Sequence, residues 1–276
     1  MPPLIAIENL HHSFADGWDA LNGVTLRIDA GEYTALIGPN GSGKTTLAKH
    51  LNGLLKPTSG QVLVNGTDTR EASVSALARL VGYCFQNPDH QIFCASVREE
   101  LAFGPTALDL SPGEVTERVE AELAAFGLAG LRERPPAVLP PGLRRRVALA
   151  SVLTTRPRLL ILDEPGVGLD AREQADVFAR IAAYNEAGNA VLLISHDMGA
   201  VSRYSRRCLL MAAGQLVADG PPNRILCDAG ALADAGMQPP TMSRLSLATS
   251  DLGLPPLMLS PEEYGRALLR LREERS

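Results

Sequence analysis

The sequence predicts an α/β fold in which helices flank a largely parallel β-sheet. Three short apolar runs, at residues 33–37, 159–162 and 190–194, have the length and continuous hydrophobicity of strands that are buried on both faces. Two segments, residues 46–55 and residues 171–185, have the apolar spacing of helices, and each follows a glycine-containing stretch. Strands that are flanked by helices along a chain are typical of a parallel sheet.

An antiparallel β subdomain is predicted at the N-terminus. Residues 4–10 and 20–28 alternate between apolar and polar side chains, and turn-forming residues lie around the second run. Further short strands are expected at residues 61–64 and 81–85. Near the other end of this part of the chain, residues 208–217 predict a hairpin around an Ala-Gly turn.

The middle of the chain, about residues 87–155, is predicted to be an inserted helical subdomain. A long helical region at residues 96–131 is expected to break at a Gly-Pro pair (104–105) and again at a Ser-Pro pair (111–112). The serine of the second pair has the character of a helix N-cap, since glutamates follow it in the first turns. After two proline pairs, residues 143–153 predict another helix.

The chain changes character near residue 229. Proline pairs separate short helical pieces from there on, and the last piece, residues 260–270, begins with Ser-Pro-Glu-Glu, a favourable helix start. We therefore expect one main domain at residues 1–228 and a small C-terminal extension at residues 229–276.

The composition excludes several classes of protein. A chain of 276 residues that is 45% hydrophobic can bury a large core, and its net charge of −5 argues against nucleic acid as a partner. The four cysteines form no C-x-x-C pair, so neither a zinc site nor a disulfide framework is expected. No signal peptide is expected, and no apolar run approaches the roughly 18 residues of a membrane helix. If the protein works at a membrane, other chains must hold it there.

Residues 38–45, with the sequence GPNGSGKT, match the phosphate-binding loop G-x-x-x-x-G-K-[ST] in full. Glycines let such a loop turn tightly and point N–H groups at phosphate oxygens, and the following helix N-terminus adds a positive dipole. Lys44 is expected to reach the β- and γ-phosphates of ATP, and Thr45 to bind Mg²⁺. The predicted nucleotide-binding residues here are Gly38, Pro39, Asn40, Gly41, Ser42, Gly43, Lys44, Thr45 and Thr46.

A second motif, of the Walker B type, supplies carboxylates for hydrolysis. The apolar run at residues 159–162 ends in Asp163 and Glu164. Asp163 is placed to act on the metal ion, and Glu164 to polarise the attacking water as a general base. Such a motif is weak alone, but together with an upstream phosphate loop it predicts an ATPase.

With these motifs in place, the chain resembles the nucleotide-binding subunit of ABC transporters over nearly its whole length. The resemblance implies the P-loop ATPase fold of that family and three further motifs. Gln86 lies at the position of the Q-loop glutamine, which the resemblance implies is a catalytic and metal-site residue, and His196 lies at the position of the catalytic switch histidine. Residues 168–170 resemble the D-loop.

The resemblance also implies an aromatic side chain that stacks on the adenine ring. Phe14 lies at the matching position, although Trp18 and Tyr33 compete for this role.

A narrower resemblance is to the energy-coupling factor transporters for cobalt, nickel and vitamins. Residues 85–93 and 97–105 are similar to that group, and the C-terminal residues resemble its dimer-stabilising extension. This implies a second ATPase subunit, a transmembrane coupling protein and a separate membrane protein that captures the substrate, with the ATPase peripheral at the cytoplasmic face. The segment from Gln86 to about Pro105 is expected to dock on the membrane partner.

One motif departs from the family. ABC ATPases carry a signature motif, Leu-Ser-Gly-Gly-Gln, at the start of the helix before Walker B. This signature contacts the γ-phosphate of the ATP that the second subunit holds. Here the sequence is Leu-Pro-Pro-Gly-Leu, so Pro140 brings no hydroxyl and neither it nor Pro141 brings an N–H. Two or three hydrogen bonds, each worth ~1.5–3 kcal/mol to a charged group, are lost.

Because the chain's own phosphate loop and Walker B carboxylates are intact, we favour an asymmetric dimer with a different subunit that has an intact signature. The alternative is an ordinary homodimer in which Gly142 and the helix dipole still hold phosphate. Two other functions remain open: a non-transport ABC ATPase, and a regulatory ATP-binding half that hydrolyses little. Neither metal ion nor vitamin is selected as the substrate.

Overall fold

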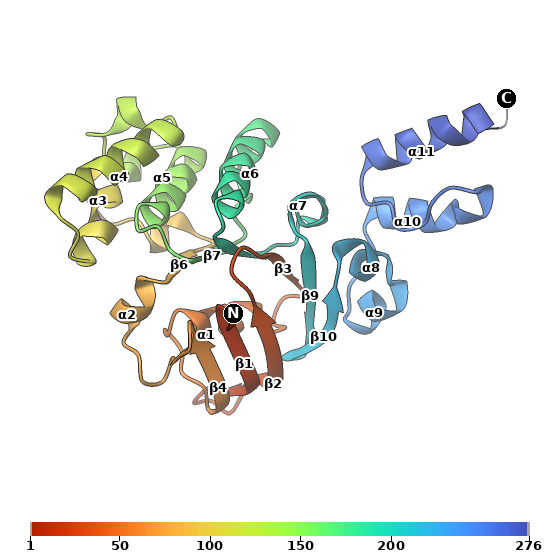
Figure 1. Ribbon diagram of the computed structural model, residues 1–276, viewed down its shortest axis with the longest axis horizontal. Helices are drawn as coiled ribbons and strands as arrows, with labels where there is room; N and C mark the ends of the chain where they lie inside the picture. The colour runs from red at the N-terminus through yellow and green to blue at the C-terminus, as the bar shows by residue number, and fades with distance from the viewer. Residues whose placement is uncertain (1, 275–276) are drawn as a thin grey trace.

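The computed structural model describes residues 2–274 and arranges their strands in two sheets (Figure 1). The smaller sheet has the order β2-β1-β4-β5 and is antiparallel throughout, as expected from the alternating pattern of the N-terminal segments. Its strands are β1 (Ile5–Ser13), β2 (Asp19–Ile28), β4 (Ser59–Val64) and β5 (Thr67–Asp68).

The larger sheet has the order β10-β9-β3-β8-β7-β6 and is parallel except for its edge strand β10. Every side chain of β3, β7, β8 and β6 is buried, which explains their continuous apolar runs. The strands are β3 (Tyr33–Ile37), β6 (Val81–Cys84), β7 (Leu159–Asp163), β8 (Ala190–Ile194), β9 (Arg207–Ala212) and β10 (Gln215–Gly220).

Helices cover both faces of this sheet (Figure 1). One face packs with the antiparallel sheet and α1 in a shared core, and the other packs against α3, α4, α5 and α6. The α-helices are α1 (Lys44–Leu51), α2 (Val74–Ala78), α3 (Val97–Ala107), α4 (Pro112–Ala125), α5 (Pro141–Leu153), α6 (Ala171–Glu186), α7 (Met198–Tyr204), α8 (Pro222–Cys227), α9 (Ala229–Asp234), α10 (Thr241–Ala248) and α11 (Pro261–Glu274). Short 3₁₀ turns lie at Pro88–His90, Ala129–Leu131, Pro136–Val138 and Ser250–Leu252.

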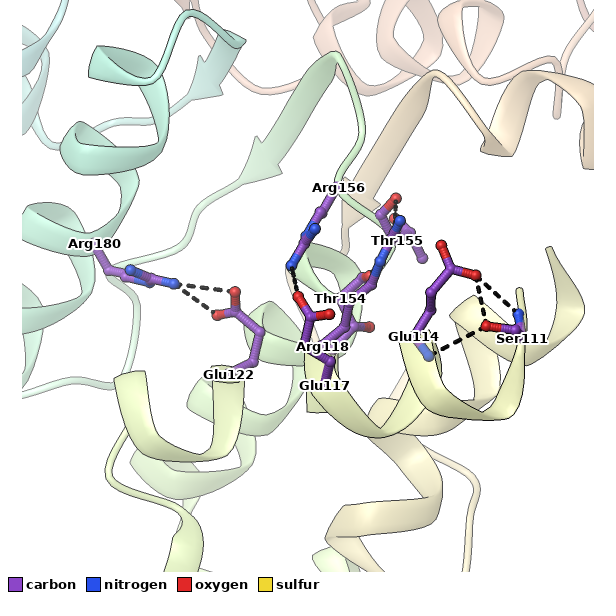
Figure 2. A network of polar contacts seen from close by, with 9 residues as sticks. All are labelled: Ser111, Glu114, Glu117, Arg118, Glu122, Thr154, Thr155, Arg156 and Arg180. Carbon is purple, nitrogen blue, oxygen red and sulfur yellow. Dashed lines mark hydrogen bonds and ion pairs between the residues drawn. The ribbon is translucent and has the colours of Figure 1, made fainter. Parts of the chain in front are cut away.

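Polar contacts start α4 and join it to neighbouring helices (Figure 2). Ser111 and Glu114 form a capping box that starts α4, as the Ser-Pro signal predicted. From the same helix, Arg118 donates to the carbonyls of Thr154 and Thr155 beyond the end of α5, at 3.2 and 3.3 Å. These bonds tie the signature helix α5 to α4.

The prediction that the helix breaks at residues 104–105 is wrong, because α3 continues through Pro105 to Ala107. Pro105 lies in the last turn, where a missing N–H removes a single helical bond, and its ring is buried. The amide of Leu108, the C-cap residue, still reaches the carbonyl of Gly104 at 3.0 Å, so the helix ends two residues after the proline.

The C-terminal extension packs beside β9 and then extends away from the domain (Figure 1). Its first helix, α9, buries Leu232 against β9 beside Leu226 of the preceding helix α8, whereas α11 leaves Leu268 and Leu269 largely exposed. Within residues 2–274 no helix has both the length and the apolar character needed to cross a membrane.

Candidate ATP site

The carboxyl ends of four parallel strands bring the predicted motifs together. Strand β8 lies between β3 and β7, and Ile194 at its end pairs with Leu36 on one side and with Asp163 on the other. Strand β6 follows β7, with Cys84 opposite Leu162. The phosphate loop, the Walker B carboxylates, His196 and Gln86 therefore emerge at one edge of the sheet, where open α/β sheets bind their ligands.

The phosphate loop leaves β3 and closes against the neighbouring strands. Gly38 has φ 149°, and a Cβ there would lie 2.2 Å from the carbonyl oxygen of Met211. At Gly43, with φ 99°, a Cβ would lie 2.6 Å from the carbonyl oxygen of Ala20. Both positions therefore require glycine, and the loop delivers the chain directly into the N-terminus of α1, a favourable place for an anion.

Two buried polar groups face the loop. The ammonium of Lys44 donates to the carbonyl oxygens of Gly38 and Pro39, each at 2.8 Å. Burial lowers the pKa of Lys44, and the nearby Glu164 and Asp163 carboxylates oppose this effect. The hydroxyl of Ser42 is buried and has no hydrogen-bond partner among the described residues. A cation and an unpaired donor in a glycine cradle suit a phosphate group.

Two of the groups predicted to bind the metal ion, the Thr45 hydroxyl and the Asp163 carboxylate, lie next to each other. The hydroxyl of Thr45, at the start of α1, donates to Oδ2 of Asp163 at 3.2 Å. Asp163 is the last residue of β7 and is 7% exposed. Oxygen ligands of this kind suit Mg²⁺. The third predicted metal residue, Gln86, is exposed beyond the end of β6.

Glu164 is held in place by the end of the neighbouring strand β8. Oε1 of its carboxylate accepts a hydrogen bond from the backbone N–H of His196 at 2.9 Å, and Oε2 accepts one from the hydroxyl of Ser195 at 3.3 Å. The ring Nε2 of His196 lies 3.7 Å from Oε1. Burial raises the pKa of Glu164, while His196 and Ser195 act in the opposite direction.

The backbone of Glu164 is also unusual, because it has φ 52°, in the left-handed region that glutamate rarely adopts. Its N–H donates to the carbonyl of Ile194 at 2.9 Å, which keeps the residue at the sheet edge after β7 has ended. A carboxylate that is buried, oriented by two donors and raised in pKa is suited to general base chemistry.

The aromatic residues near β1 narrow the choice of an adenine platform. Tyr33 is excluded, because it is 2% exposed within β3. Phe14 follows β1 directly and stacks on Trp18, with ring centroids 5.7 Å apart and an interplanar angle of 13°. Its other neighbour is the His12 ring, which meets it edge-on at 4.7 Å. Phe14 and Trp18 therefore form one stacked pair, and Trp18 is the exposed partner.

Comparison with known proteins shows which family this chain belongs to. Residues 21–167, more than half of the chain, match the ABC transporter family model. The chain belongs to the ABC transporter ATP-binding proteins. It is 36% identical over 97% of its length, and 87% of the relative, to the energy-coupling factor transporter ATP-binding protein EcfA of Methanothermobacter thermautotrophicus.

Two further matches point to the same group of ABC transporter proteins. Identity to the cobalt import ATP-binding protein CbiO of Rhodobacter capsulatus is 38%, covering 90% of this chain and 89% of the relative. The structure of cbiO1 from Clostridium perfringens, part of the ABC transporter complex cbiONQ, aligns with a TM-score of 0.75 at 31% identity, over 89% of this chain and 99% of that one. Against some longer putative ABC transporter ATP-binding proteins, the chain spans only 43% or 41% of the relative.

These matches confirm the predicted family, the fold class with its antiparallel, helical and α/β parts, and an ATP-binding, transport-type ATPase function.

In this ABC ATPase the sequence analysis missed three polar residues of the site. Ser195 orients Glu164, and its position between a buried strand and His196 was the available signal. Gln91, five residues after Gln86, bonds to the carbonyl of Ala148 in α5 at 2.6 Å, so the more buried glutamine of this loop has a structural role. Arg145, 4% exposed, had no sequence signal beyond an Arg-rich run.

Arg145 connects three ABC motifs through its guanidinium. It lies in the signature helix α5 and donates to the carbonyl of Phe85, just before Gln86, at 3.0 Å. A longer bond of 3.4 Å reaches the carbonyl of Val167, just before the D-loop. Asp170 of the D-loop caps α6 in a capping box with Glu173.

The signature segment begins α5 with its two prolines. Pro140 is the N-cap, no side chain caps the helix, and Pro141 is the first helical residue. This agrees with the expectation that prolines start the helix without disrupting it. The Glu173 carboxylate lies against Gly142, where a Cβ would be 2.5 Å from Oε1. The first turn of α5 therefore offers amides of Gly142 and Leu143 beside a negative charge.

Proposed function

We propose that this ABC ATPase hydrolyses MgATP to drive import of a metal ion or a vitamin through membrane subunits of the energy-coupling factor type. The observation that supports hydrolysis best is the position of Glu164, held by Ser195 and the His196 amide beside the phosphate loop. Import and a metal ion as the substrate are suggested by the name of the cobalt import relative. The vitamin follows from the resemblance of residues 85–105 to the energy-coupling factor transporters.

The metal part of the proposal rests on Thr45 and Asp163. Their hydroxyl and carboxylate groups are oxygen donors of the type that Mg²⁺ prefers, and they already lie within hydrogen-bond distance. Mg²⁺, when bound there with ATP, would neutralise charge on the β- and γ-phosphate oxygens. Gln86, which is exposed two residues beyond the end of β6, would have to turn inward to reach this site.

For the chemical step, the chain supplies a base and a positioned donor. Glu164 accepts a proton from the attacking water, and its raised pKa makes it a better base than an exposed glutamate. The ring of His196, 3.7 Å from the same carboxylate, donates toward the transferring phosphoryl group. Lys44 leaves the carbonyls of Gly38 and Pro39 to contact phosphate oxygens.

The docking partner in the proposal is a transmembrane coupling protein that contacts residues 86–105. Phe93 and Phe103 support this assignment, since they are 65% and 52% exposed and pack edge-on with centroids 4.7 Å apart. An exposed aromatic pair marks a surface for another protein. A substrate-capturing membrane protein completes the complex, and the ATPase lies at the cytoplasmic face of the membrane.

The proposed ATPase partner is a different subunit with an intact signature. The N-terminus of α5 lacks a side-chain cap, and Pro140 and Pro141 offer no N–H. The carboxylate of Glu173 beside Gly142 adds repulsion toward a phosphate presented by the other subunit. One composite site would thus be weak and the other strong.

The C-terminal extension is proposed to stabilise that dimer. Along α11, the residues Tyr264, Ala267, Leu268 and Leu271 recur at helical spacing and form an apolar stripe. Leu268 and its neighbour Leu269 are 44% and 61% exposed in the single chain. A second extension packed along this stripe would bury Leu268.

The test of hydrolysis is a Glu164→Gln variant in the assembled transporter. ATP binding should be retained and ATP turnover should fall by several orders of magnitude. The matched control is Glu186→Gln, an exposed glutamate at the end of α6. Normal turnover by Glu164→Gln would refute the assignment of the base.

A regulatory ATP-binding half is the second candidate, and the proline-containing signature is the observation that favours it. Single-turnover hydrolysis in the complex separates the two functions. ATP bound at this chain's phosphate loop is hydrolysed in the first case and persists in the second. The asymmetric dimer itself predicts little ATPase activity from the purified chain alone. A rate equal to that of a complete subunit pair would contradict it.

A further inference from the structure

Tyr83 places a phenol hydroxyl inside the ATP site from a strand that otherwise carries only packing side chains. It is the third residue of β6, pairs with Ile161 of β7, and is 8% exposed. Its ring packs against Phe85 with centroids 4.6 Å apart, within the core shared by both sheets. The hydroxyl donates to Oδ2 of Asp163 at 3.0 Å, in a buried hydrogen bond.

The same carboxylate oxygen receives a second hydrogen bond, from Thr45 at 3.2 Å. Two donors from different elements, one from β6 and one from α1, fix the rotation of the Asp163 side chain. Neither bond uses the other oxygen, Oδ1. A hydroxyl that binds a metal ion through its oxygen lone pair can keep its proton on Asp163, so both bonds are compatible with a loaded site.

The phenol is chemically fit to be a permanent donor. A phenol has one proton to donate and an ionised carboxylate can only accept, so the direction of the Tyr83–Asp163 hydrogen bond is fixed by the two groups themselves. Other buried tyrosines of this chain do not donate a hydrogen bond to a carboxylate, so the bond from Tyr83 is not a general consequence of burial. The hydroxyl of Tyr33 is buried without a partner among the described residues, and that of Tyr184 donates to the backbone carbonyl of Pro157.

We propose that Tyr83 is a positioning residue for the divalent cation, holding Oδ2 of Asp163 so that the other carboxylate oxygen is free to act on the metal. This inference rests on the proposed Mg²⁺ site and adds a residue to it. Partners that orient metal-ligand groups typically affect metal affinity by about 10–100-fold. Because the nucleotide phosphates also hold Mg²⁺, we expect the lower end of that range.

The experiment measures equilibrium binding of the non-hydrolysable analogue adenylyl imidodiphosphate, first in EDTA and then over a series of Mg²⁺ concentrations. The variants are Tyr83→Phe and, as a matched control, Tyr33→Phe, which removes an equally buried hydroxyl from β3. In EDTA, all three proteins should bind the analogue with equal affinity. The Mg²⁺ concentration that gives half of the affinity gain should rise about tenfold for Tyr83→Phe and stay unchanged for Tyr33→Phe.

Each outcome is decisive. An unchanged Mg²⁺ midpoint in Tyr83→Phe overturns the positioning role. A loss of analogue affinity that is as large in EDTA as in Mg²⁺ overturns it too, because Tyr83 would then support the folding of the phosphate loop and not the metal site. A wild-type protein that shows no Mg²⁺ dependence overturns the proposed metal site itself, so the two failures are distinct. Thermal unfolding checks that the variants are folded, and Tyr83→Met, of similar volume and without a donor, repeats the test. In a double-mutant cycle with Asp163→Asn, additive effects would also contradict the proposal.

Discussion

The backbone amide of His196 and the side-chain carboxylate of Glu164 share a 2.9 Å hydrogen bond across the ends of two neighbouring strands. The orientation of the proposed base therefore depends on the main chain of residue 196, whereas the imidazole ring, 3.7 Å away, is free to serve the phosphoryl group. Replacing the His196 ring should thus impair turnover without releasing Glu164 from its place. The hydroxyl of Ser195 is the side chain that a substitution can remove from this arrangement.

The Ser195→Ala variant should shift the pH dependence of turnover. Burial raises the pKa of Glu164, and the Ser195 hydrogen bond lowers it, so removing the hydroxyl raises it further. The base must be deprotonated, and activity is lost as pH falls through this pKa. We expect the acid limb of the kcat profile to move to higher pH, with Ser202→Ala, a half-buried serine of α7 whose hydroxyl bonds to the Gly199 carbonyl, unchanged. A shift to lower pH would contradict the hydrogen-bond assignment.

The Arg145→Met variant should lose stability. It removes a buried guanidinium that donates to the carbonyls of Phe85 and Val167, and bonds to a charged group contribute roughly 1.5–3 kcal/mol each. We expect the free energy of unfolding, measured in urea, to fall by about 3 kcal/mol, the lower limit for two such bonds, because the bond to Val167 is long. The control is Arg146→Met, whose partner Asp176 is 61% exposed at 3.6 Å and which should cost below about 1 kcal/mol. Equal losses would show that Arg145 is not a link between the motifs.

Restoring donors to the signature should strengthen the ATP-dependent association of this chain with itself. The double variant Pro140→Ser, Pro141→Gly supplies a hydroxyl and two N–H groups at the start of α5. In a Glu164→Gln background, which traps ATP, sedimentation should show at least about tenfold tighter association, since one charged hydrogen bond corresponds to that factor or more.

Glu173→Gln should add to this gain, because it removes a negative charge beside Gly142. The same changes at the proline pair 135–136 serve as the control. If association is unaffected by the signature variant, the prolines are not the cause of asymmetry.

Substitutions of Phe14 and Trp18 should separate base stacking from support. If Phe14 carries the adenine ring, Phe14→Ala weakens ATP binding by about 1–3 kcal/mol, the range for loss of base stacking on an aromatic side chain. Trp18→Ala should have a smaller effect, since it acts through the 5.7 Å stack with Phe14. Binding of inorganic triphosphate measures the phosphate loop alone and should not change in either variant. The reverse order of effects would assign the platform to Trp18.

Charging the exposed aromatic pair should separate docking from nucleotide binding. Phe93→Asp and Phe103→Asp should each reduce co-purification with the membrane subunits while leaving ATP affinity unchanged. Val138→Asp, at a position that is 64% exposed and outside residues 86–105, is the control. Full assembly with both aspartates present would move the docking surface elsewhere.

The strand-end motifs could be predicted from the sequence because each follows an apolar run, and parallel strands end at a common edge. Asp163, Glu164 and His196 are found there for that reason. Their mutual contacts could not be predicted, since they depend on which strands are neighbours. The insertion of β8 between β3 and β7 is what brings Ser195 to Glu164.

Other features depend on contacts between distant segments, which local patterns do not encode. The approach of Glu173 to Gly142 joins α6 to α5, and the Tyr83 hydroxyl could equally have remained unpaired, as that of Tyr33 does. At residues 104–105, the Gly-Pro pair predicts a break because proline lacks an N–H, but the last turn of α3 tolerates the single lost hydrogen bond.

The strand order has a consequence for how this protein is synthesised. Strand β3 emerges from the ribosome long before β7. The position between these two strands in the sheet is filled by β8, residues 190–194, which is translated later than both. Until that short segment has been translated, the phosphate loop and its catalytic acids have no common edge to occupy. A nascent chain of this protein therefore cannot be stabilised by ATP at the complete site during most of its synthesis, and nucleotide-dependent protection from proteolysis should begin only after residue 196 is free to fold.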